Sequence, residues 1–185
     1  MIKERQPGHR PSGTSAQAEI SASEGRSYDR HQQLCRAEGT AMGIVHVFVR
    51  ATEEELTRAI ADPTSFEGTS GRPPEEMADL DKALPDIQEL LVAADIKIDL
   101  ELGGEVIFPY GNDTDFVMVW SVDDVADTAE QLRDVPFDRL ATFVDDPDLV
   151  DDPDELDYLK EYYEDVVGFF VAAAEARAGA FMITT

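Results

Sequence analysis

Few residues of this 185-residue chain could carry out acid–base chemistry. His46 is the single histidine of residues 42–185. A general base needs an accessible ring and a partner within hydrogen-bond distance. A histidine that shares a strand face with Ile44 and Phe48 is more often a partly buried structural residue, and we favour that interpretation. One histidine alone also excludes a metal site with several histidine ligands.

A second candidate is the cluster Asp79, Asp81 and Lys82, which precedes a predicted helix. Burial and pairing of a carboxylate with a lysine shift both pKa values, so such a cluster can form a site. The alternative is structural: Asp81 caps the helix, and Lys82 forms a surface ion pair with Asp79 or Asp86.

A third candidate is the turn Gly103-Gly104-Glu105, followed by Pro109-Tyr110-Gly111. Glycine lets a ligand approach the backbone closely, so this turn could form the mouth of a pocket. A hairpin that needs positive φ at glycine is the alternative. The catalytic hypothesis is therefore a small-molecule enzyme with a pocket near Asp81, Lys82, Glu105 and Tyr110.

The run of acids at 145–154 suggests calcium, but it lacks the spacing and the glycine of an EF-hand loop. We therefore predict neither a metal site nor a cofactor. Tyr158 and Tyr162 lie four residues apart among acids, as in a protein-binding strip, although core packing explains most helix aromatics. The predicted binding residues are Asp145, Asp148, Asp152, Asp154, Tyr158 and Tyr162.

Charge divides the chain near Met42. Residues 1–41 carry six basic and five acidic side chains, whereas residues 42–185 carry nine basic and 35 acidic ones. Such acidity disfavours nucleic acid and anionic membranes as partners and is compatible with a basic protein, or with a solvated surface that binds nothing specific. The lone cysteine, Cys35, excludes an intramolecular disulfide, and the first 25 residues lack an apolar signal region, so we predict a cytoplasmic protein.

The elements that must position these residues form an α+β fold. We predict a single domain over 42–185, with a small mixed or largely antiparallel sheet packed with about five helices. Residues 1–41 are predicted to be a disordered segment or a non-native extension. Alternation and caps predict strands over 43–50, 96–102, 105–110, 115–121 and 180–184, and helices over 52–61, 75–94, 122–133, 136–144 and 153–177. Pro85 should kink or restart the helical region 75–94.

Four stretches resemble the YfbM-like family of small bacterial proteins of unknown function. They are Met42-Gly43 with the strand and acidic helix start that follow, Leu80-Asp81-Lys82-Ala83, Gly103-Gly104-Glu105, and Tyr158-Leu159 through Phe169-Phe170. The resemblance covers nearly all of 42–185 and implies a compact α+β domain but no reaction. The chain departs from the family pattern at Leu84, where an aromatic is common, and at Gln88, where a histidine is common.

Our leading hypothesis is a non-enzymatic, regulatory or immunity-like domain that engages a basic protein through its acidic 145–165 region. The rivals are the small-molecule enzyme described above and divalent-cation binding by carboxylates alone. The sequence does not fix the oligomeric state.

Overall fold

The computed structural model describes residues 44–109, 116–143 and 153–185, so the predicted segment 1–41 lies outside the described residues. The described residues form one unit built on a five-stranded antiparallel sheet, and the predicted α+β fold is confirmed. The strands are β1 (His46–Ala51), β2 (Met77–Asp79), β3 (Glu105–Pro109), β4 (Phe116–Trp120) and β5 (Gly179–Thr184). Their order across the sheet is β2-β1-β5-β4-β3, which places the C-terminal strand at the centre.

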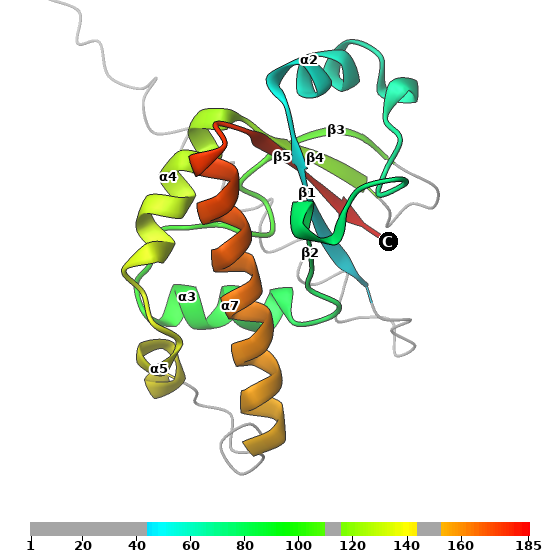
Figure 1. The fold of residues 1–185 in the computed structure, drawn as a ribbon. Coiled ribbons are helices and arrows are strands. Elements are labelled where there is room, and N and C mark those ends of the chain that lie inside the picture. Colours follow the sequence, from blue (N-terminus) through cyan, green and yellow to red (C-terminus); the bar gives the residue numbers. More distant parts are fainter. Residues whose placement is uncertain (1–43, 110–115, 144–152) are drawn as a thin grey trace, which may run out of the picture. The chain divides into compact units, whose positions relative to one another are not determined.

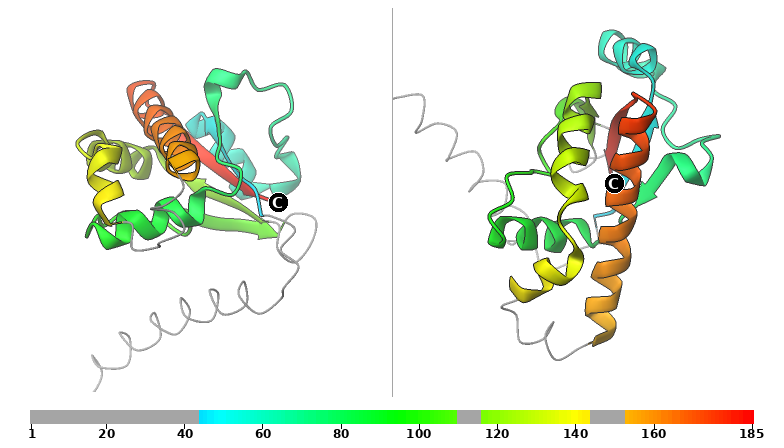
Figure 2. Two further views of the ribbon diagram at one scale, coloured as in Figure 1. Left: turned by 90° about the horizontal axis from the view of Figure 1, so that it is seen from below. Right: turned by 60° about the vertical axis from the view of Figure 1, so that its left-hand side comes forward.

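Helices cover both faces of the sheet. They are α2 (Glu53–Ala61), α3 (Leu84–Ala93), α4 (Val122–Arg133), α5 (Phe137–Leu140) and α7 (Pro153–Glu175). Figure 1 and Figure 2 show α4 and α7 side by side on one face, with α3 running crosswise below α4 and behind the middle of α7, and α2 on the other face. None of the helices in the described ranges is both long enough and apolar enough to cross a lipid bilayer.

The core consists of two layers because side chains of successive strand residues point to opposite faces. Phe48, Met118, Trp120 and Met182 pack beneath α3, α4, α5 and α7 in the larger layer. Val49, Val119 and Phe181 pack beneath α2 in the smaller one. The sheet is therefore buried on both faces.

Two predicted helix starts are confirmed in detail. The Thr52 hydroxyl accepts a hydrogen bond from Glu55 N, and the Glu55 carboxylate accepts one from Thr52 N. Ser121 and Asp124 form the same reciprocal pair at the start of α4. Each pair satisfies two backbone donors that a helix start leaves unbonded.

The predicted helix over 75–94 is wrong in its first half. Residues Met77–Asp79 form β2, which pairs with β1, and the helix begins only at Leu84, with Pro85 in its first turn. Proline fits this position because the first helical residues need no backbone donor. In the half that is helical, Leu84, Ile87 and Leu91 form the buried side of the helix, and all three are fully buried.

The predicted strand over 96–102 is also wrong. Ile98 and Leu100 are buried as the alternation predicted, but this segment joins no sheet. The buried Gln88 side chain takes the place of a neighbouring strand: its Nε2 donates to Ile98 O at 2.9 Å, and its Oε1 accepts from Leu100 N at 2.8 Å. Alternating burial therefore arises here without a strand ladder.

Gly103 and Gly104 are required for a different reason from the one expected. Among the described residues, the glycines with positive φ are Gly68 and Gly71, so the hairpin explanation is wrong. A Cβ on Gly103 would lie 2.7 Å from Trp120 Cη2, and one on Gly104 would lie 2.8 Å from Trp120 Nε1. Both glycines therefore allow the backbone to pack directly against the buried indole.

We expect Gln88→Leu to lower the free energy of unfolding by ~2–4 kcal/mol, because it leaves a buried N–H and a buried C=O unpaired. Gln88→His should have a smaller effect, since an imidazole retains one donor and one acceptor. Urea denaturation measures both. Gln131→Leu, at an exposed position of α4, is the control and should change stability by less than ~0.5 kcal/mol. Equal stability of Gln88→Leu and the control would contradict this role.

Candidate functional site

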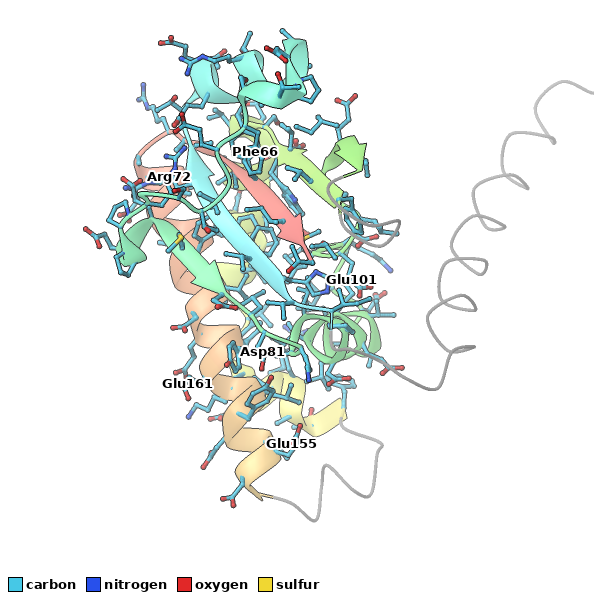
Figure 3. The ribbon with its side chains drawn as sticks, turned by 90° about the vertical axis from the view of Figure 1, so that its right-hand side faces the viewer. Phe66, Arg72, Asp81, Glu101, Glu155 and Glu161 are labelled. Carbon is cyan, nitrogen blue, oxygen red and sulfur yellow. The ribbon has the colours of Figure 1, made fainter. Side chains whose placement is uncertain are left out.

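Two predicted candidates that are far apart in the sequence meet at one place on the surface. The Tyr158 hydroxyl on α7 donates a hydrogen bond of 3.3 Å to the carboxylate of Asp81, which lies in the loop between β2 and α3. The Tyr158 and Tyr162 rings lie edge to face, with centroids 4.6 Å apart. We name Asp79, Asp81, Tyr158 and Tyr162 the tyrosine–aspartate patch. Figure 3 shows the Asp81 loop lying beside α7, which carries Glu155 and Glu161.

The loop holds Asp81 in a conformation that few residues adopt. Its φ is 43°, and its backbone N–H donates to Asp79 Oδ1 at 3.0 Å. Aspartate tolerates positive φ better than most residues because its short polar side chain bonds locally. Asp81 does not cap α3 as expected, because Ala83 occupies the N-cap and no side chain bonds there. Its carboxylate is turned instead toward Tyr158.

Both phenols of the patch resist ionisation. Burial, followed by the charge of Asp81, raises the pKa of Tyr158 to about 12. Burial, followed by the charges of Asp81 and Asp79, also raises the pKa of Tyr162. At neutral pH the patch therefore presents protonated phenols and aromatic faces beside carboxylates, which is an environment that favours a cation.

The outward side of α7 extends this acidic environment. Its exposed acids are Asp154, Glu155, Asp157, Glu161, Glu164 and Asp165. Lys160 is the single basic residue of the helix, and its Nζ lies 3.9 Å from the Glu164 carboxylate. Asp157, Glu161 and Asp165 follow one another at four-residue spacing, which aligns like charges along one side of the helix.

Of the remaining predicted residues that the structure describes, Glu105 lies away from the patch. Glu105 begins β3, at the opposite edge of the sheet from β2 and the Asp81 loop. Four strand spacings of about 4.8 Å separate these edges. Lys82 is exposed next to Asp81. Tyr110, Asp145, Asp148 and Asp152 lie outside the described residues.

His46 is buried rather than poised at the surface. Its side chain is only 6% exposed, and its Nδ1 lies 3.2 Å from the Thr184 hydroxyl on the adjacent strand. Burial lowers the pKa of His46 to about 4. The ring is therefore neutral at physiological pH, as expected of a structural histidine.

Sequence reasoning missed two further features. Burial, followed by the charges of Asp99, Asp86 and Glu89, raises the pKa of Glu101, but these acids are spread over 86–101 and form no recognisable motif. A shallow depression lies between α2 and residues 65–72. The sequence signal that could have indicated this depression is a pair of arginines, Arg58 and Arg72, because residues 42–185 contain only nine basic residues.

In the parts of the chain that the structure describes, no three His, Cys, Asp or Glu side chains are grouped to hold a metal ion.

Comparison with known proteins gives a family but no activity. The model of a family described as a domain of unknown function, DUF1877, matches residues 42–183. No match is found among the curated proteins or among the solved structures. The match starts where the charge of the chain changes, and it includes every residue of the tyrosine–aspartate patch.

The buried His46 should make the protein less stable in mild acid. Its pKa is about 4 when folded and ordinarily near 6.5, so the unfolded chain binds the extra proton between these values. The free energy of unfolding is therefore unaffected by this group above pH 6.5 and falls as the pH drops toward 4. At pH 5 the loss is ~2 kcal/mol. Urea unfolding at pH 7.5 and pH 5 measures the loss. His46→Gln should remove that part of the pH dependence, and an identical pH dependence in this variant would contradict the assignment.

Proposed function

The chain belongs to the DUF1877 family, whose function is unknown, and we propose that it is a non-enzymatic domain that binds a basic protein through α7 and the tyrosine–aspartate patch. We further propose that it falls in the YfbM-like group, that it acts in the cytoplasm, and that its role is regulatory or immunity-like. The family match assigns none of these properties. The proposal rests on the surface chemistry of α7.

The observation that carries the proposal is the self-repelling side of α7. Like charges four residues apart destabilise a helix by ~0.2–0.5 kcal/mol per pair. Asp157 with Glu161 and Glu161 with Asp165 form two such pairs, and all three side chains are exposed. The repulsion within these pairs opposes formation of the helix. A basic partner would convert this repulsion into attraction.

Tyr158 and Tyr162 would supply binding affinity that charge alone does not. Exposed ion pairs add little affinity because water and salt screen them. Aromatic side chains are enriched at protein interfaces because they bury a large area with few rotatable bonds. Tyr158 is already held by Asp81, so docking an arginine or lysine against the pair costs little ordering entropy. The predicted interface is therefore an aromatic centre surrounded by acids.

The net charge supports fast and salt-sensitive association. Residues 42–185 carry nine basic against 35 acidic side chains, and this imbalance accelerates encounter with a basic partner. It also repels nucleic acid and anionic membranes. The patch, rather than the net charge, would select one basic protein from others.

Neutralising the α7 side should abolish partner binding. The test variant combines Asp157→Asn, Glu161→Gln and Asp165→Asn. The matched control combines Asp123→Asn, Asp127→Asn and Glu130→Gln, which removes the same charge from exposed positions of α4. Immobilised wild-type and control proteins should capture from a cell lysate a partner that high salt releases, and the α7 variant should not capture it. Thermal denaturation should show the α7 variant to be at least as stable as wild type, because repulsion is relieved.

Two results would contradict the proposal. One is capture of the same proteins by the α7 variant and the α4 control, since binding would then depend on net charge alone. The other is the failure of wild type to retain any salt-sensitive partner.

A further inference from the structure

The tyrosine–aspartate patch combines partly exposed aromatic rings with carboxylates. Tyr158 and Tyr162 are half-buried, so part of each ring is open to solvent, and the two rings lie edge to face. After burial, the charges of Asp81 and Asp79 are what raise the pKa of Tyr162, so both carboxylates lie near this ring. Two rings and two carboxylates therefore converge on one small area of the surface.

The two carboxylates of the patch lack a cation from their own chain. Asp79 Oδ1 accepts from the Asp81 N–H at 3.0 Å, and Asp81 Oδ2 accepts from the Tyr158 hydroxyl at 3.3 Å. The other oxygen of each carboxylate accepts no hydrogen bond from the residues that the structure describes. Within these residues neither carboxylate forms an ion pair, although Lys82 is adjacent in the sequence.

Elsewhere on the surface the chain uses its own arginines to bind carboxylates. Arg50 on β1 lies 2.6 Å from Glu76, and Arg72 lies 2.5 Å from Glu55 on α2. These pairs join segments that are distant in the sequence, and the guanidinium group supplies the donors in each of them. The patch has the acceptors for a pair of this kind, and an arginine of another chain could supply the donors.

We propose that the patch receives an arginine side chain of the basic partner, in preference to a lysine. This inference rests on the proposed function and names the group that the partner must present. The guanidinium would stack on the Tyr162 ring and donate to Asp79 and Asp81. A guanidinium is planar, weakly hydrated and has donors in a fixed fork, so it stacks on a ring and binds carboxylates together. An ammonium group is compact and strongly hydrated, so it gains less from a ring face.

The test uses the full chain, ¹⁵N-labelled, with N-acetylarginine amide and N-acetyllysine amide as probes. Each probe carries one positive charge and no charged terminus. Titration should shift the backbone amide signals of Asp79, Asp81, Tyr158 and Tyr162 in a saturable manner. The arginine probe should bind about fivefold more tightly than the lysine probe, because it gains from the ring and the carboxylates together. Free L-arginine should bind more weakly than the blocked probe, because the patch repels its carboxylate.

Variants assign the preference to particular side chains. Tyr162→Leu removes the ring and should bind the two probes equally, whereas Tyr162→Phe keeps a ring and should retain the preference. Asp79→Asn should weaken the arginine probe about fivefold, while its amide oxygen can still accept from the Asp81 N–H. Phe143→Leu and Asp127→Asn, at exposed positions that do not belong to the patch, are the matched controls and should bind as wild type does. The amide spectrum verifies that each variant is folded.

Three outcomes would overturn this inference. The first is an absence of saturable shifts at the patch, or equal affinity of wild type for the two blocked probes. The second is a preference for arginine that persists in Tyr162→Leu. The third is tighter binding of free L-arginine than of the blocked probe, which would indicate a small-molecule ligand. The proposed function fails by a different result, namely equal partner capture by the α7 variant and the α4 control, so the two failures are distinguishable.

Discussion

The contact on which the rest of the fold depends is the aromatic junction of Phe48, Trp120 and Phe170. These residues belong to β1, β4 and α7, and their ring centroids lie 5.2–5.9 Å apart in edge-to-face arrangements. Each such pair contributes ~0.5–1.5 kcal/mol beyond the area that it buries. Because the junction joins the longest helix to two strands distant from it in sequence, it determines which side of α7 faces water. The same indole explains why Gly103 and Gly104 must lack side chains.

The carboxylates of the described residues fall into two groups by their role in the fold. One group is used by the fold: Glu55 and Asp124 close helix starts, and Glu76 links two arginines. For Glu55, burial alone would raise the pKa, but hydrogen bonds from Thr52 and the pairing with Arg72 outweigh burial and lower it. The other group lies on the outer side of α7, where the exposed Asp157, Glu161 and Asp165 repeat at four-residue spacing. Like charges at this spacing destabilise a helix, whereas a high net charge keeps a protein soluble, so the fold by itself does not require a partner there.

Sequence reasoning succeeded where local chemistry decides structure and failed where distant contacts decide it. The capping pairs at Thr52 and Ser121, and the long helix after Pro153, follow from residues close in sequence. The segment 96–102 was misread because a side chain, Gln88, satisfies the backbone groups that a neighbouring strand would otherwise bond. The candidate site was found only in fragments, because Asp81 and Tyr158 are 77 residues apart and only the fold brings them together.

Two of the candidate residues, His46 and Tyr158, have pKa values that are shifted away from neutrality. A general acid or base works best when its pKa lies near the operating pH. Burial moves the pKa of His46 down to about 4, and burial with Asp81 moves that of Tyr158 up to about 12. Both shifts lead away from neutrality, so each group keeps one protonation state under physiological conditions. Under the proposed function, Tyr158 would therefore offer a partner the same protonated phenol and the same ring face across the physiological pH range.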